Sequence, residues 1–141
     1  MTEPAETRSI LLVDDNADDR TRVHRLLRGH ARRYEIVDCA SGAEALAILR
    51  RGDTHFDCVL LDQYLSDMEG VELLNRLRGP GGQVPLPVTM LTGHGNDAAA
   101  AYALELGAED YLLKDEVTAH ALVRSIENVI EKFDIRRERE S

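Results

Sequence analysis

Short apolar runs recur along the chain and are separated by longer segments in which apolar residues repeat at helical spacing. Runs of this length between polar flanks are typical of strands that are buried on both faces. The expected strands are 10–13, 34–39, a stretch around Leu60, 87–91 and 110–113. Two helices are expected after Asn16 as far as Gly29 and after Ser41 as far as Gly52. The other three are expected over 70–78, over 97–106 and from Thr118 through Phe133.

Residues that begin and end helices stand at the boundaries of these segments. Asn16 and Thr118 are suited to helix N-caps, and Ser41 with Glu44 fits the capping-box pattern. Gly107 is placed as a helix C-cap. Strands that alternate with helices predict an α/β fold, (βα)5 and doubly wound, with a parallel five-stranded sheet and helices on both faces.

The length of the chain, 141 residues, predicts one domain. We expect a polar lead-in over residues 1–8, the domain over 9–132, and a polar tail or helix extension over 133–141. The net charge of −9 argues against direct nucleic-acid binding. No apolar run is long enough to insert into a membrane, and no secretion signal is visible. Cys39 and Cys58 are isolated within apolar runs, which favours reduced core thiols and a cytoplasmic protein.

Chemically active side chains follow four of the five strands. Asp14 and Asp15 follow the first, Asp62 the third, Thr92 the fourth and Lys114 the fifth. The carboxyl ends of parallel strands meet at one edge of the sheet, where ligands bind. Crowded carboxylates raise one another's pKa unless a cation is present. Mg²⁺ is the usual cation, because it takes one or two carboxylates together with waters and phosphate oxygens.

This set of residues resembles the receiver domain of bacterial response regulators, the chemotaxis-type fold of two-component signalling, over about 9–132. The resemblance implies the strand order 2-1-3-4-5. It is carried by the acidic pair after the first strand, by Thr92 and by two local motifs: Asp62 with Met68 and Gly70 downstream, and Lys114 preceded by Tyr111.

The resemblance implies a role for each residue of the pocket. Asp62 would accept a phosphoryl group from a phosphohistidine. Asp15 would bind Mg²⁺ directly together with Asp62, and the backbone carbonyl of Tyr64 would complete the protein's share of the ligands. Asp14 would act through water or position the lysine. Lys114 would neutralise the phosphoryl oxygens.

The resemblance also implies a conformational switch. Thr92 would bond the phosphoryl group, and the ring of Tyr111 would turn inward to fill the space that this opens. The fourth helix, the fifth strand and the fifth helix would then form the readout surface. Gln63, Tyr64 and His94 flank the site at positions that tune the lifetime of the phosphoryl group.

Two positions depart from the family pattern. The family often has a proline after the lysine, joined by a cis peptide bond, but this chain has Asp115. A cis bond without proline costs about 3 kcal/mol, so a trans bond or real strain is expected. Ser66 stands where the family often has another proline.

The resemblance implies a stand-alone receiver with two kinds of partner. One is a histidine kinase or a histidine phosphotransfer protein, and the other is a downstream protein target. The arginine-rich first helix is either a solvated face or the docking surface for the phosphodonor. A homodimer through the last helix would require apolar residues that also point outward.

Three other classes of protein are alternatives to a receiver that catalyses only its own phosphorylation and dephosphorylation. A Mg²⁺-dependent aspartyl-phosphate phosphatase needs a second acid two residues after its nucleophile, where this chain has Tyr64. A nucleotide or flavin binder needs a phosphate-cradling loop after the first strand, where this chain is acidic. A phosphorylation-independent, receiver-like binding module is the third alternative, and Asp115 keeps it open.

Overall fold

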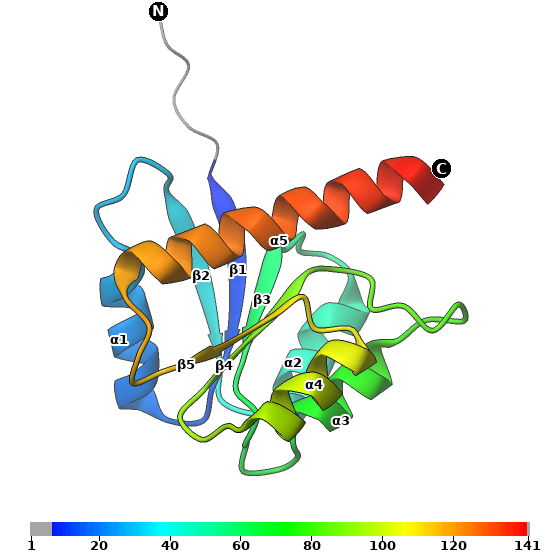
Figure 1. The fold of residues 1–141 in the computed structure, drawn as a ribbon, viewed down its shortest axis with the longest axis horizontal. Helices are drawn as coiled ribbons and strands as arrows, with labels where there is room; N and C mark the ends of the chain where they lie inside the picture. The colour runs from blue at the N-terminus through cyan, green and yellow to red at the C-terminus, as the bar shows by residue number, and fades with distance from the viewer. Residues whose placement is uncertain (1–6, 141) are drawn as a thin grey trace, which may run out of the picture.

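A computed structural model describes residues 7–140 and shows a parallel sheet in the order β2-β1-β3-β4-β5, as predicted (Figure 1). The strands are β1 (Arg8–Val13), β2 (Tyr34–Cys39), β3 (Cys58–Leu61), β4 (Val88–Thr92) and β5 (Asp110–Leu113). The helices are α1 (Ala17–Leu27), α2 (Gly42–Arg51), α3 (Gly70–Leu77), α4 (Asp97–Leu106) and α5 (Ala119–Glu140). The α/β architecture inferred from the sequence is therefore confirmed.

Helices cover both faces of the sheet and form two cores. Helices α1 and α5 pack over Ile10, Leu12 and Leu60 on one face. Helices α2, α3 and α4 pack over the opposite face, where Val59 and Leu61 are fully buried. Successive residues of one strand therefore point to opposite layers, as the geometry of a strand requires.

The helix caps follow the sequence signals, with one difference in detail. The side chains of Asn16, Ser41 and Thr118 each accept a hydrogen bond from the backbone N–H three residues later. Glu44, expected to bond back to its capping serine, instead accepts from the N–H of Ala40 at 3.1 Å. The carboxylate thus reaches one residue beyond the predicted partner.

Several boundaries differ from those expected. Strand β1 begins at Arg8, whose N–H donates to the carbonyl of Arg33, so pairing starts before the apolar run. Thr92, expected in a loop, is the last residue of β4 and is paired with Leu113. Helix α5 continues through the polar segment to Glu140, which is the helix extension that the sequence left open beside a polar tail. Most of the lead-in, residues 1–6, lies outside the described residues.

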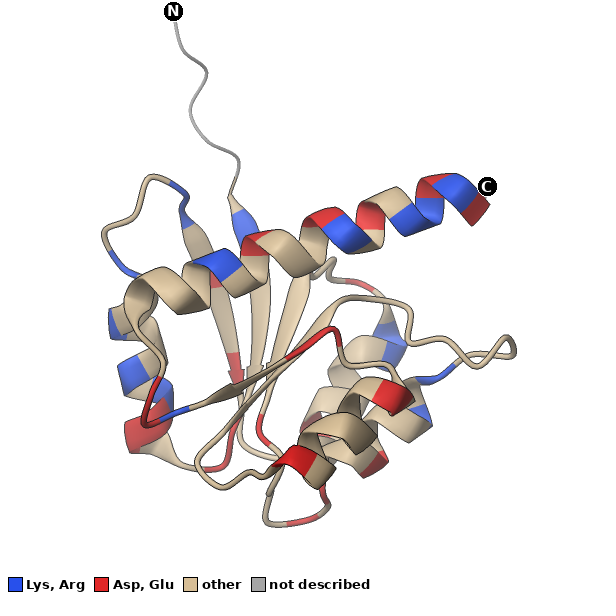
Figure 2. Cartoon of the chain, viewed as in Figure 1, with Lys and Arg blue, Asp and Glu red and all other residues tan. Residues whose placement is uncertain are grey.

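The surface of the described chain is strongly charged. Acidic residues gather at the lower edge of the view in Figure 2, where the strands end, and basic residues lie along α1. Within residues 7–140, no helix combines the length and apolar character that crossing a membrane would need. On α5, Ile135 is a large apolar residue that remains 45% exposed.

Candidate functional site

The backbone ladder of the sheet extends into the loops that carry the site residues. The N–H of Asp62 donates to the carbonyl of Val13 at 3.0 Å, and the N–H of Lys114 donates to that of Thr92 at 2.8 Å. Asp62 and Lys114 are therefore each held by the strand next to them. The parallel register brings the ends of β1, β3, β4 and β5 to one edge of the sheet.

The ammonium of Lys114 lies at the centre of the site. Its Nζ is 2.7 Å from Asp14 Oδ2, 2.9 Å from Asp62 Oδ2 and 2.8 Å from Asp19 Oδ2. The lysine, Asp14 and Asp62 are all buried. Because an ammonium has three protons to donate, these three carboxylates satisfy it completely.

Burial and charge act in opposite directions on the ionisable groups of this site. Burial raises the pKa of Asp14, although the hydrogen bond from Lys114 and the N–H of Asn16 work against that effect. Burial alone would lower the pKa of Lys114, but the hydrogen bonds to Asp14, Asp19 and Asp62 outweigh it, and the pKa is raised. Lys114 is therefore a charged group in the site.

Three carboxylates converge beside the lysine. Ligand oxygens of Asp14, Asp15 and Asp62 all lie within 4.8 Å of one another. Asp15 is exposed, whereas the other two are buried. Hard oxygen donors so arranged, with one side open to solvent, suit a small divalent cation that keeps several of its waters. The acidic cluster predicted from the sequence is thus assembled.

The loop that follows Asp62 folds back toward α3. The N–H of Gly70 donates to the carbonyl of Gln63 at 2.7 Å, and Tyr64 pairs with Glu69 in an isolated antiparallel bridge. A Cβ at Gly70 would lie 2.5 Å from the carbonyl oxygen of Asp62. Only glycine allows this close approach, so Gly70 helps to shape the loop.

The three residues expected to tune the site differ in exposure. Tyr64 is 47% exposed, and His94 is also exposed. The side chain of Gln63 is buried, and its Oε1 has no hydrogen-bond partner among the described residues. Gln63 is thus turned into the protein.

Thr92 and Tyr111 lie on neighbouring strands. Thr92 is fully buried, and its Oγ1 donates to the carbonyl of His94 at 3.2 Å. The hydroxyl of Tyr111 is buried without a hydrogen-bond partner in the described chain. It lies so close to Gly95 that a Cβ there would be 2.5 Å from it. The ring of Tyr111 is therefore turned inward in this structure.

The comparisons with known proteins agree with this geometry. The protein-family model for the response regulator receiver domain matches residues 10–127, which is most of the chain. The chain belongs to the response regulator receiver family. A rice protein (Oryza sativa subsp. indica), "Two-component response regulator ORR3", is 34% identical over 113 residues, covering 80% of this chain and 84% of the rice protein.

Further relatives of this receiver domain come from other organisms. "Transcriptional regulatory protein SrrA" of Staphylococcus aureus is 33% identical over 107 residues, and the match spans 74% of this chain but only 41% of that protein. The structure of a CheY-like receiver domain protein from Methanospirillum hungatei superimposes with a TM-score of 0.73 at 27% identity. That superposition covers 96% of this chain and 100% of the other.

The departure at Asp115 has a plain outcome. The peptide bonds of the described residues are all trans, and the bond between Lys114 and Asp115 is one of them. The lysine nevertheless reaches Asp62. Of the two outcomes expected from the absence of proline, a trans bond or real strain, the structure has the trans bond.

Sequence reasoning missed three residues that organise this receiver site. Asp19 contacts Lys114, and Arg22 donates to the backbone carbonyls of Lys114 and Val117. Asp67 accepts from the N–H groups of Gly42 and Ala43, both at 2.9 Å. The first pair stands three residues apart on α1, a spacing that places two residues on one helix face and could have signalled a shared role.

Proposed function

We propose that this chain is a phosphoacceptor switch of a two-component or phosphorelay system and that Asp62 is its phosphoacceptor. The observation that carries the proposal is the position of Asp62, whose carboxylate contacts the Lys114 ammonium at 2.9 Å and lies within the acidic cluster. The proposed donor is the phosphohistidine of a histidine kinase or of a histidine phosphotransfer protein. Membership of the receiver family supports a kinase partner.

In the proposed reaction, a carboxylate oxygen of Asp62 attacks the phosphorus atom and forms an acyl phosphate. The bond between phosphorus and the imidazole nitrogen breaks, its electron pair stays on that nitrogen, and the nitrogen takes up a proton. Lys114 turns one donor from the carboxylate to a phosphoryl oxygen. Phosphoryl transfer depends mainly on such positioning and charge neutralisation.

We propose that Asp15, Asp62 and the backbone carbonyl of Tyr64 hold a Mg²⁺ ion, with Asp14 acting through a bound water. The convergent oxygens of the acidic cluster fit this ion. When bound, Mg²⁺ supplies positive charge to the phosphoryl oxygens. Asp14 also has a second function that needs no metal, because it contacts Lys114 directly.

We propose that Thr92 and Tyr111 couple phosphorylation to the surface formed by α4, β5 and α5. Thr92 would exchange its bond to the His94 carbonyl for one to a phosphoryl oxygen. The inward position of Tyr111 is the state that this exchange would favour. Phosphorylation can shift the population only through such differential contacts. Gln63, Tyr64 and His94 remain candidates for setting the phosphoryl lifetime.

The remaining parts of the proposal concern the setting of the protein. Cys39 and Cys58 are free and buried, which fits the reducing cytoplasm. The activity proposed is confined to the chain's own phosphorylation and dephosphorylation. Its output would be a contact with a protein target.

An intact mass spectrum after incubation with phosphoramidate and Mg²⁺ tests this function. The parent protein should gain one phosphoryl group, and Asp62→Asn should gain none. Circular dichroism of both proteins establishes that they are folded. A folded parent that binds Mg²⁺ but gains no phosphoryl group from this donor or from a phosphohistidine protein would instead indicate a phosphorylation-independent binding module.

A further inference from the structure

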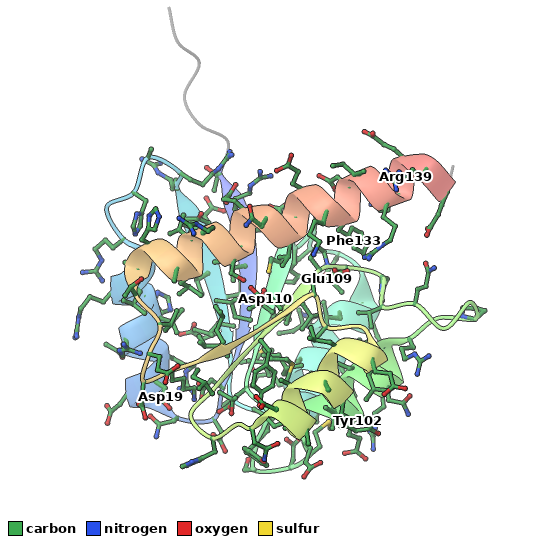
Figure 3. All side chains as sticks on the ribbon, in the orientation of Figure 1. Asp19, Tyr102, Glu109, Asp110, Phe133 and Arg139 are labelled. Atoms are coloured by element: carbon green, nitrogen blue, oxygen red, sulfur yellow. The ribbon has the colours of Figure 1, made fainter. Side chains whose placement is uncertain are left out.

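Helix α1 contacts Lys114 at two separate points. Asp19 Oδ2 lies 2.8 Å from the ammonium, and Figure 3 shows Asp19 on α1, on the side nearest the segment that follows β5. One turn further along the helix, the guanidinium of Arg22 donates to the backbone carbonyl of Lys114 and, at 3.3 Å, to that of Val117. One contact holds the end of the side chain, and the other holds its backbone.

We propose that Asp19 and Arg22 are positioning residues that clamp Lys114 for phosphoryl transfer. The clamp deepens the function proposed above and rests on it. No proline ring restricts the backbone after Lys114, because Asp115 stands there and the bond between them is trans. The side chain of Arg22, which has several donors, instead ties the segment between β5 and α5 to α1.

Arg22 is suited to its half of the clamp. A guanidinium presents several donors in a fixed plane, so one side chain can hold two carbonyls at once. Both acceptors belong to the turn that carries Lys114 into α5, and the N–H of Val117 closes that turn by donating to Leu113 at 3.0 Å. A lysine at position 22 would keep the charge but could not reproduce the planar, two-point contact.

Asp19 is suited to the other half. Its own N–H donates to the capping side chain of Asn16, which fixes the first turn of α1. Its carboxylate and that of Asp14 hold two protons of the ammonium, so the third proton is directed at Asp62. When Asp62 carries a phosphoryl group, that third donor would turn to a phosphoryl oxygen while Asp14 and Asp19 keep hold of the other two protons.

A direct test follows the ammonium signals by NMR in the unphosphorylated protein. The chain has two lysines, Lys114 and the exposed Lys132, so assignment needs only one variant. An ammonium held by three carboxylates exchanges its protons slowly and gives an observable signal, whereas an exposed one does not. The Lys114 signal should be sharp in the parent and in Asp18→Asn and should broaden through faster proton exchange in Asp19→Asn, where only Asp14 and Asp62 still hold the ammonium. Asp18 is the matched control, because it is exposed and also lies in the first turn.

A second test measures phosphorylation by phosphoramidate at saturating Mg²⁺. Removing a negative charge by itself favours an anionic donor, so electrostatics alone predicts a faster reaction for both variants. The clamp predicts that Asp19→Asn is slower than Asp18→Asn by about fivefold, as expected for one lost charge-assisted hydrogen bond. The Mg²⁺ dissociation constants of the two variants should agree within about twofold, because neither residue is a proposed ligand.

Arg22→Lys tests the second contact, with Arg25→Lys as its control. Arg25 is exposed on the same helix. Only the first variant should slow phosphorylation, with Mg²⁺ affinity unchanged.

Equal proton-exchange rates of the Lys114 ammonium in Asp19→Asn and the parent, no such signal in the parent, or equal phosphorylation rates in the paired variants would overturn the clamp. If the parent itself takes up no phosphoryl group, the proposed function fails. The NMR comparison still decides whether α1 positions the lysine.

Discussion

Lys114 organises the site because one ammonium contacts three carboxylates from segments that follow two neighbouring strands, β1 and β3. Asp14 lies in the loop before α1, Asp19 lies in the first turn of that helix, and Asp62 directly follows β3. The ammonium offsets part of the repulsion among the acids that would form the metal site. Asp62 is therefore held in place before any ligand is bound.

The side chain of Tyr111 has a buried hydroxyl with no hydrogen-bond partner in the described part of the chain. Replacing Tyr111 by phenylalanine removes a hydroxyl that gives up its hydrogen bonds to water on folding and gains none within the protein. Tyr111→Phe should therefore leave the free energy of unfolding unchanged or raise it by up to about 1 kcal/mol. Urea unfolding measures this change.

Tyr34 provides the matched control for that substitution. Its hydroxyl donates to Glu127 Oε2 at 2.8 Å, so Tyr34→Phe should lower the free energy of unfolding by about 1–2 kcal/mol. Equal losses in the two variants would mean that the Tyr111 hydroxyl has a partner in solution.

At the scale of elements, the loop after β3 is fixed to the N-terminus of α2. Asp67 accepts from the N–H groups of Gly42 and Ala43, which would otherwise be unpaired at the start of that helix. These two hydrogen bonds hold the pKa of Asp67 below its usual range. The loop that contains Tyr64, whose backbone carbonyl is a proposed ligand of the metal ion, is thus anchored to a neighbouring helix.

This anchor should appear in the pH dependence of stability. Because the pKa of Asp67 is lowered by folding, its contribution is present above the unfolded value of 3.8 and is lost as the pH falls through the folded value. Asp67→Asn should therefore be less stable than the parent at about pH 6, and the difference should shrink at about pH 3. Urea midpoints at both pH values measure it.

Asp134→Asn serves as a control, because Asp134 is exposed on α5 and its side chain makes no hydrogen bond within residues 7–140. Its difference from the parent should not depend on pH in the same way. A constant difference for Asp67→Asn across the two pH values would contradict the role assigned to the carboxylate.

The elements themselves could be predicted well from the sequence, because periodicity and caps are local signals. Asp62 and Lys114 were placed at one edge because the carboxyl ends of parallel strands must meet there. Asp19 was missed for a physical reason: an acid in the first turn of a helix is sufficiently explained by the helix dipole. Its contact with Lys114 depends on the rotation of α1 against the sheet, which no local pattern encodes. The inward position of Tyr111 likewise depends on Gly95, from another strand's loop.

For the whole molecule, metal binding should couple to stability. A cation that binds the folded acidic cluster but not the unfolded chain stabilises the protein by mass action, by about 2.7 kcal/mol at a concentration a hundred times the dissociation constant. Mg²⁺ should therefore raise the free energy of unfolding of the parent. Urea unfolding with and without Mg²⁺ measures the gain.

Asp15→Asn tests the site of that effect. Asp15 is exposed, so its replacement should change the stability of the metal-free protein by no more than about 0.5 kcal/mol. The increment from Mg²⁺ should be largely lost. The same increment in parent and variant would place the stabilising ion elsewhere on this acidic protein.

The central claim is that Asp62 itself takes the phosphoryl group, and chemical mapping of the modified residue tests it most directly. Borohydride reduces an acyl phosphate to an alcohol, so an aspartyl phosphate becomes homoserine in the peptide that contains it. After phosphorylation with Mg²⁺ and reduction, peptide mass spectrometry should find homoserine at position 62, and Asp14 and Asp15 should remain aspartate. Homoserine at position 14 or 15, or a phosphoryl group on a histidine with Asp62 unchanged, would contradict the account.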